Sequence, residues 1–345
     1  MQLYTDPRGQ AYQQIIDVAV QHSEYFVLGE KFGDAPDVDR SRYWAVLNRL
    51  EPYLEKKIVI DGDDQEDVSR IRETYRSHAF YTAGTYYWYR CCEESGQLLK
   101  QVADRLSDWI YPNLPEDLCF VKKGGGDYLY SIVHERMYGM EVTEDEAVKL
   151  MERIPGLFLK LKAHRNLDGL LDDAIRHKTD WLYISRHGLT ELPDRIRKLT
   201  ELRELEIFEQ DVYRLPEGLF ELTKLESLTI MSAELEAIPA SIQKLKNLKK
   251  LNICCASSNR PAPGWKPKPK EEISLNRIPP EIGELERLEE LTIQYTSIQT
   301  LPPELEKLTS LRYLNLGMGM IKQKPAFLRR MKQLKYVTVA QDSLY

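Results

Sequence analysis

Adjacent histidine and glutamate side chains, His134 and Glu135, are the first candidates for chemistry in this sequence. Such a pair can transfer protons or bind a metal ion. The zinc-binding pattern HExxH would require a second histidine at position 138, where Tyr138 stands. We therefore interpret His134 as a surface or hydrogen-bonded histidine at the end of a strand. If the N-terminal half were an enzyme, His134, Glu135 and Asp117 would be the first residues to mutate.

Two loops resemble ligand-binding motifs only in composition. Three glycines at 124–126 follow Lys122 and Lys123, whereas a phosphate-binding loop places its glycines before the lysine and a helix after it. We interpret them as a hairpin turn. The acidic run at 61–67 lacks the spacing of a calcium-binding loop, because Gln65 and Glu66 occupy the third-ligand and glycine positions. A solvated acidic loop is the better interpretation, and we expect no metal and no cofactor.

Five cysteines occur as two adjacent pairs, Cys91-Cys92 and Cys254-Cys255, and the single Cys119. Neighbouring residues on a strand point to opposite faces, so a disulfide within a pair would be strained. We expect free thiols, with one cysteine of each pair packed inside and the other facing out. The spacing also matches neither a zinc site nor a secreted disulfide framework.

Leucines recur with a period of 23 residues in the C-terminal half. Starting from Leu202, Leu225 and Leu288, offsets 0, 3, 5, 10, 13, 17 and 20 carry leucine, isoleucine or valine, and proline stands at offset 14. The stretch LxxLxL predicts a short strand with its apolar side chains inward, and the Leu-Pro step ends the loop that follows. The last apolar positions have helical spacing and should form the convex side.

This pattern resembles the leucine-rich repeat family in its 23-residue form, over residues 179–345. The resemblance implies a curved solenoid with a parallel sheet on its concave side, in which stacked units bury one continuous core. Offset 8 usually carries asparagine in that family, which bonds the backbone of the turn. Here the six residues at that offset are His187, Gln210, Ala233, Ala256, Thr296 and Gly319.

The repeat register predicts which residues line the concave sheet, because offsets 2, 4 and 6 alternate with the buried leucines. Large side chains on this face are of the types enriched at protein interfaces. The predicted partner-binding residues of the sheet are Trp181, Tyr183, Glu204, Glu206, Phe208, Met231, Gln294, Tyr313 and Tyr336. The alternatives are scattered apolar residues without a role and a face occupied by the N-terminal domain.

An insertion of about 17 residues interrupts the repeat, since Leu248 and Leu288 are 40 residues apart. It lies near 257–274 and contains four prolines, which favour an extended segment. Trp265, followed in the sequence by Lys266 and Lys268, is predicted to contact a partner at the rim of the concave face. A tolerated excursion without function is the competing interpretation.

Basic residues crowd the C-terminal end of the chain, at positions 322, 324, 329, 330, 332 and 335. They could meet an acidic partner or nucleic acid. We favour a solvated cap that keeps the last strand from pairing with other chains.

Composition and charge restrict the class of protein. The chain has 345 residues, 42% hydrophobic and 30% charged, as in globular proteins. Its start lacks the pattern of a signal peptide, and its apolar runs are too short for a membrane span. With the cysteine usage, these features predict a cytoplasmic protein. The stretch at 109–120, with the glycine turn and tyrosine-rich strand after it, resembles uncharacterised bacterial proteins, which implies a bacterial source but no activity. Residues 1–175 hold 21 Lys and Arg against 31 Asp and Glu, a net charge of −10, which argues against nucleic acid binding by this half.

The N-terminal half predicts an α+β domain at 1–155. We expect helices at 9–29, 41–54, 91–111 and 142–154, the last with a Thr143…Glu146 capping box. Strands are expected at 56–61 and 79–90, and a β-hairpin at 114–135. About half of the aromatic run Tyr86 to Tyr89 should face the core. Residues 156–178 should form a strand and a helix that cap the repeats of 179–345.

Three functional hypotheses follow. The leading one is a non-enzymatic module that binds a partner protein through the concave face and the Trp265 loop, without membrane association. A narrower form is an immunity or antitoxin protein that inhibits a toxin, since an acidic domain can complement a basic target. The third is an enzyme in the N-terminal domain that the repeats direct to its target.

Overall fold

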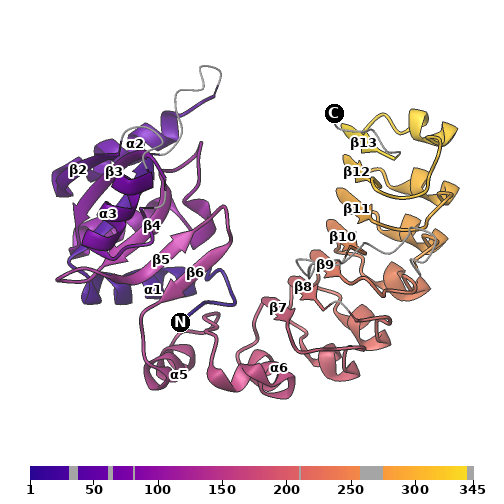
Figure 1. Ribbon diagram of the computed structural model, residues 1–345, viewed down its shortest axis with the longest axis horizontal. Coiled ribbons are helices and arrows are strands. Elements are labelled where there is room, and N and C mark those ends of the chain that lie inside the picture. Colours follow the sequence, from indigo (N-terminus) through magenta and orange to yellow (C-terminus); the bar gives the residue numbers. More distant parts are fainter. Residues whose placement is uncertain (31–37, 61–64, 81, 210, 257–274, 340–345) are drawn as a thin grey trace. The chain divides into compact units, whose positions relative to one another are not determined.

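The structure is a computed structural model, and it describes residues 1–30, 38–60, 65–80, 82–209, 211–256 and 275–339. The chain divides into two compact units, Met1–Lys162 and Ala163–Tyr345. Each unit has its own sheet (Figure 1).

The N-terminal unit mixes helices with an antiparallel sheet. Its elements in chain order are α1 Gln10–His22, β1 Tyr25–Glu30, α2 Ser41–Leu50, η1 Glu51–Tyr53, β2 Leu54–Ile60, α3 Gln65–Tyr75, β3 Gly84–Arg90, α4 Glu93–Val102, η2 Leu106–Asp108, β4 Glu116–Val121, β5 Asp127–Ile132, β6 Met137–Met140 and α5 Glu144–Arg153. The strands pair in the order β2-β3-β1-β4-β5-β6. The fold class is therefore the predicted α+β domain.

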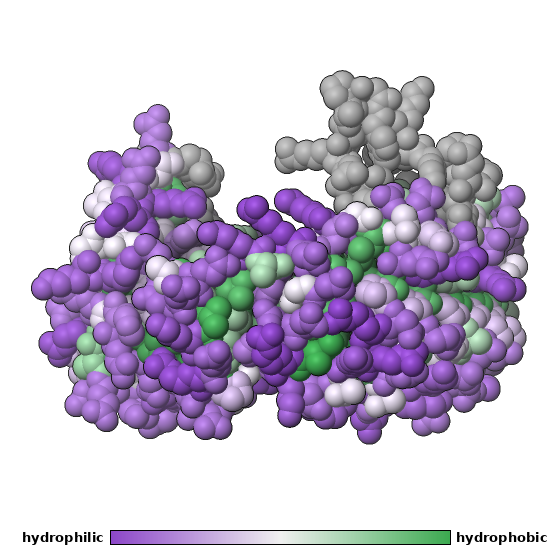
Figure 2. Space-filling view, turned by 90° about the horizontal axis from the view of Figure 1, so that it is seen from below, coloured by the Kyte–Doolittle hydropathy of each residue, from purple (hydrophilic) through white to green (hydrophobic). Residues whose placement is uncertain are grey.

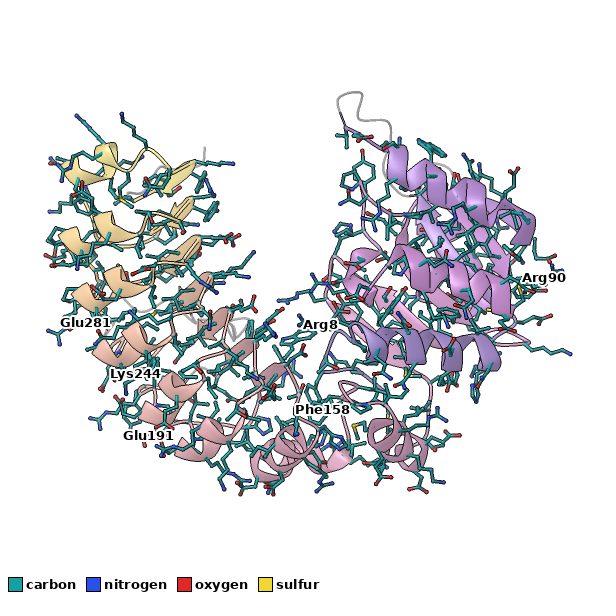
Figure 3. All side chains as sticks on the ribbon, turned by 180° about the vertical axis from the view of Figure 1, so that it is seen from behind. Arg8, Arg90, Phe158, Glu191, Lys244 and Glu281 are labelled. Carbon is teal, nitrogen blue, oxygen red and sulfur yellow. The ribbon has the colours of Figure 1, made fainter. Side chains whose placement is uncertain are left out.

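Helices cover both faces of this sheet. On one face α3 packs against the sheet, where Val68 joins a buried cluster with Val27, Tyr86 and Trp88. On the other face the Phe26 ring stacks on Tyr89, and α1, α2 and α4 lie over the sheet (Figure 3). Because both faces are covered, all four aromatic residues from Tyr86 to Tyr89 are buried, rather than half of them as expected.

The predicted helix at 9–29 is wrong beyond His22, because β1 begins at Tyr25. This strand lies between β3 and β4, so its residues from Phe26 to Gly29 are all buried. A strand buried on both faces shows no polar alternation and is easily taken for the continuation of a helix.

The predicted helix at 91–111 ends at Val102. The chain then extends through Ala103 and forms the 3₁₀ turn η2, whose Leu106 and Ser107 amides both donate to the Asp6 carboxylate. Burial raises the pKa of Asp6. Leu106 is fully buried through a turn held by Asp6 rather than through the predicted helix.

Other local predictions are confirmed. β4 and β5 form the expected antiparallel hairpin across the glycines 124–126, which all have positive φ. Thr143 and Glu146 form the capping box at the start of α5, with the Glu146 amide donating to Thr143 Oγ1 over 3.3 Å. The sequence did not predict β6, and the strand expected after residue 155 is reduced to a single bridge between Leu3 and Leu159.

The C-terminal unit is a solenoid of repeated strand-and-turn units with a parallel sheet, as predicted. After η3 Lys162–Arg165, which spans the unit boundary, and α6 Leu167–Arg176 come seven strands, β7 Trp181–Ser185, β8 Glu204–Phe208, β9 Ser227–Met231, β10 Lys250–Cys254, β11 Glu290–Gln294, β12 Tyr313–Asn315 and β13 Tyr336–Thr338. They pair in parallel and in sequence order, as Figure 1 shows. The insertion does not interrupt the sheet, since Leu251 pairs with Leu291.

The opposite side of the solenoid consists of 3₁₀ turns, where the spacing of apolar residues predicted helical structure. These are η4 Asp194–Lys198, η5 Glu217–Glu221, η6 Ala240–Lys244, η8 Pro280–Glu284, η9 Pro303–Lys307 and η10 Ala326–Arg330. Each follows a proline, and five residues are too few for a stable α-helix, so i to i+3 bonds such as Leu219 N to Pro216 O (3.1 Å) close the turn.

Ion pairs join successive turns on this outer side. Lys224 pairs with Glu201 at 2.7 Å and Lys307 with Glu284 at 2.9 Å. Lys244 projects from this side in Figure 3. On the face seen in Figure 2, hydrophilic side chains predominate and hydrophobic residues appear as narrow strips between them.

Candidate functional site

The seven-stranded sheet brings the predicted concave residues together in three rows. The β7, β8, β9, β10 and β11 strands match residue for residue at their first, third and fifth positions, while the leucines and isoleucines at the second and fourth positions are buried. The first row is Trp181, Glu204, Ser227, Lys250, Glu290, Tyr313 and Tyr336. The second is Tyr183, Glu206, Thr229, Asn252, Thr292, Asn315 and Thr338, and the third is Ser185, Phe208, Met231, Cys254 and Gln294.

Aromatic and acidic side chains meet at the first two strands of this face. Trp181 Nε1 donates to Glu206 Oε1 over 3.1 Å, and Trp181 is 7% exposed. The Tyr183 and Phe208 rings lie with centroids 5.1 Å apart. This end of the face therefore combines aromatic rings with two carboxylates, those of Glu204 and Glu206.

The middle of the face is small and polar. Ser227, Thr229 and Asn252 provide hydroxyl and amide groups, and Lys250 Nζ pairs with Glu290 Oε1 at 2.8 Å. Their charges cancel within the pair.

The last strands carry exposed aromatic residues. The rings of Tyr313 and Tyr336 stack with centroids 4.5 Å apart and an interplanar angle of 9°. They are 37% and 46% exposed, respectively. Gln294 Nε2 donates to Asn315 Oδ1 over 3.3 Å, so the neighbouring amides are held in place beside the stack.

Trp265, Lys266 and Lys268 lie outside the described residues, as does Ala340, the last residue predicted on the concave face. The acidic loop at 61–64 lies outside them as well.

The turns that follow the strands lack the usual asparagine and use other groups. The buried Glu209 carboxylate accepts from the His187 amide at 2.6 Å, the Gly188 amide at 3.1 Å and the Leu189 amide at 3.4 Å. Ser232 Oγ, one unit later, donates to the Val212 carbonyl at 2.6 Å. The turn is therefore held one position earlier than the asparagine of the family pattern.

Three units place a residue with positive φ at this position, and in the first of them Glu209 also holds the turn that follows. Arg186, Tyr295 and Met318 stand where Glu209 and Ser232 stand in their units, and all three have positive φ. A residue with positive φ turns the backbone out of the strand direction, at a small cost in conformational strain. The rim of the concave face therefore differs between the units.

The enzyme candidates of the N-terminal unit have structural partners, and His134 is a hydrogen-bonded histidine as predicted. His134 Nε2 lies 3.0 Å from Glu116 Oε1 rather than beside the Glu135 carboxylate. Asp117 is buried, and its Oδ1 accepts from the Val133 amide at 2.7 Å, so it holds the hairpin backbone. The His134 side chain is half-exposed at the end of β5.

Sequence reasoning missed a second histidine–carboxylate pair. Both the Nδ1 and the amide of His78 lie within hydrogen-bond distance of Asp127 Oδ2, at 2.8 and 2.7 Å, and the ring stacks on Tyr130. An open depression of about 440 Å³ beside His78 is also lined by Arg72 and Arg76. The sequence held no signal for it, because His78 and Asp127 are 49 residues apart.

All five cysteines are free thiols. Burial raises the pKa of Cys91 to about 12 and that of Cys255 to about 12, so both stay protonated at neutral pH. Among the described residues, no three histidine, cysteine or acidic side chains lie together as metal ligands. In that same part of the chain, no helix has the length and apolar character needed to cross a bilayer.

No protein-family model and no curated protein sequence matches this chain. Solved structures of leucine-rich repeats do. The repeat domain of the type III effector XopL is 22% identical, with a TM-score of 0.41 over 50% of this chain and 56% of that one. InlJ from Listeria monocytogenes is 18% identical, with a TM-score of 0.36 over 47% and 30%. The ectodomain of the Arabidopsis receptor kinase HAESA, solved with a peptide hormone, is 23% identical, with a TM-score of 0.33 over 44% and 24%. The match thus spans little more than half of the XopL domain and less of the other two.

Proposed function

We propose that this protein is a non-enzymatic interaction module of the cytoplasm, which binds a partner protein across the concave sheet β7–β13. The observation that carries the proposal is the exposed stack of Tyr313 and Tyr336. The stack lies outside the core, because leucine and isoleucine fill the buried positions of the sheet. Tyrosine is enriched at the centres of protein interfaces. The free thiols are compatible with a reducing compartment.

The size of the face also supports a protein ligand. Seven strands about 4.8 Å apart give a row about 29 Å long, which suits an extended segment or a helix better than a small molecule. The face is mixed in chemistry, with rings at both ends and hydroxyls between them. Such a mixture is typical of interfaces that must also remain soluble when free.

The test uses two paired substitutions in the full chain. Thr229→Arg with Thr292→Arg places two long cations in the middle row of the face. Thr200→Arg with Thr309→Arg makes the same chemical change at exposed positions off the sheet. Proteins captured from a lysate are quantified for both variants and the parent chain.

We expect a partner that is retained by the Thr200/Thr309 variant and lost by the Thr229/Thr292 variant. Both variants must keep the unfolding transition of the parent, so that loss of capture reports the face and not the fold. A partner that binds both variants equally would contradict the proposal.

A further inference from the structure

Residues 311–339, the last repeat and the strand after it, are uniformly basic. They contain seven lysines and arginines and no aspartate or glutamate. By contrast, residues 201–225 contain seven acidic residues and three basic ones. The second repeat and the last one therefore differ strongly in charge.

One charged residue precedes each strand of the sheet, and these residues form a row along which the sign of the charge can be followed from unit to unit. Backbone bonds join successive members of the row, for example Lys335 N to Arg312 O at 2.7 Å. The row runs Asp180, Arg203, Glu226, Lys249, Glu289, Arg312 and Lys335. Its sign alternates at every step except the last, where a cation follows a cation. Earlier in the row, the Glu226 carboxylate forms ion pairs with both Arg203 and Lys249, because its two neighbours in the row carry the opposite charge.

Most cations at this end have no carboxylate beside them. Arg330 pairs with Glu306, and Lys324 Nζ donates to the Val337 carbonyl at 3.3 Å. The five others form no ion pair with the described part of the chain and are exposed: Arg312, Lys322, Arg329, Lys332 and Lys335. Among the described cations of this end, Lys324 is the one that binds the backbone of the edge strand β13.

The unpaired cations adjoin the tyrosine stack. Arg312 directly precedes Tyr313 and Lys335 directly precedes Tyr336, on neighbouring strands. Two cations and two tyrosines therefore stand at the beginning of the same two strands, at one corner of the sheet. β13 is also the last strand of the sheet order, so nothing described in the chain pairs with its outer edge.

We propose that this corner binds an acidic segment of the partner protein, with its carboxylates on Arg312 and Lys335 and an aromatic or proline ring on the tyrosine stack. A carboxylate would continue the alternating row, and an exposed tyrosine face binds a second ring by stacking. The inference rests on the proposed function, since it specifies which segment of the protein partner docks at this end.

A nucleic acid fits the corner less well. Tyr313 and Tyr336 already stack on each other, so a base can reach only the outer ring face. Glu289 immediately precedes the neighbouring strand β11, where its exposed carboxylate would repel a phosphate backbone that followed the sheet. A protein segment can match this local alternation of charge, whereas a polyanion cannot.

The test measures binding of fluorescently labelled poly(Glu,Tyr) copolymer to the full chain by anisotropy, beside poly-Glu and an oligo(dT) strand. Two double variants probe the corner, Arg312→Gln/Lys335→Gln and Tyr313→Ala/Tyr336→Ala. Lys178→Gln/Lys198→Gln is the matched control, because it removes the same charge from exposed lysines at the other end of the solenoid.

We expect poly(Glu,Tyr) to bind more tightly than poly-Glu. The Arg312/Lys335 variant should bind about fivefold to tenfold more weakly and depend less on salt. The tyrosine variant should bind both polymers equally. An equal loss in the control variant, or tighter binding of oligo(dT) than of poly(Glu,Tyr), would overturn the inference.

Capture of the partner separates this inference from the proposed function. If Arg312→Gln/Lys335→Gln retains a partner that Thr229→Arg/Thr292→Arg loses, the concave face binds the partner but the acidic segment is wrong. If both variants retain it, both proposals fail. If both variants lose the partner and the Lys178→Gln/Lys198→Gln control retains it, both the proposed function and the acidic segment are supported.

Discussion

Tyr313 and Tyr336 occupy the same position of successive repeats, and their rings stack 4.5 Å apart on the open face of the sheet. Both are more than a third exposed, so the stack is not part of the leucine core. A 23-residue period thus places two identical side chains side by side at a surface.

The first prediction concerns the coupling of these rings. Replacing either tyrosine by alanine removes the same contact, so the two substitutions should not be additive. A double-mutant cycle on the free energy of unfolding should give a coupling of about 0.5–1 kcal/mol. Additive effects of the two substitutions would mean that the rings do not support each other.

The second prediction separates the buried side of a strand from its open side. Leu251→Ala should lower the free energy of unfolding by about 2–5 kcal/mol, because Leu251 is fully buried between Leu228 and Leu291. Asn252→Ala, one residue further, should change it by no more than about 0.5 kcal/mol, since Asn252 is exposed. Urea denaturation of both variants checks this, and comparable losses would contradict the assigned faces.

The repeat register was predictable because each leucine of the pattern has one structural role. Spacing predicted the strand positions, and the resemblance implied a parallel sheet; the pairing of β10 with β11 shows that the register continues across the insertion. Spacing also placed Tyr313 and Tyr336 on the same face. That their rings stack depends on side-chain rotamers, which spacing does not determine.

The N-terminal unit was harder to predict because its signals are not periodic. β1 is buried on both faces and lacks alternation, and α4 ends where the distant Asp6 organises the next turn. The pairs His78–Asp127 and His134–Glu116 arise from contacts across the sheet and not from sequence spacing. Tertiary context decided each of these features.

Glu209 gives the third prediction. Its buried carboxylate accepts from the backbone amides of residues 187, 188 and 189. Glu209→Ala leaves these donors without an acceptor and should cost about 1–3 kcal/mol. Hydrogen exchange of the same amides should accelerate. Glu286→Ala, at an exposed glutamate, is the control and should have no effect on either measurement.

The fourth prediction is a pH dependence. A hydrogen bond from Lys249 Nζ, 2.8 Å from Glu226 Oε2, is the largest cause of the lowered pKa of Glu226, and Arg203 lowers it further. A carboxylate with a folded-state pKa below its unfolded value of about 4.3 stabilises the fold above that pH. This contribution disappears as the pH falls through the folded-state pKa.

Glu226→Gln should therefore lower the free energy of unfolding by up to about 1 kcal/mol at neutral pH, and the difference from the parent should shrink progressively below about pH 4. Denaturation at a series of pH values measures it. A difference that stays constant down to about pH 3 would assign the effect to packing instead of charge.

The most direct test of the central claim is site-specific photocrosslinking in living cells. A photoreactive phenylalanine analogue at Thr229 or Thr292 lies in the middle row of the concave sheet, and at Thr200 or Thr309 it lies off the sheet. A concave protein-binding face predicts one discrete crosslinked partner from positions 229 and 292 and none from 200 and 309. The same crosslinked protein from all four positions, or a discrete product only from 200 and 309, would contradict it.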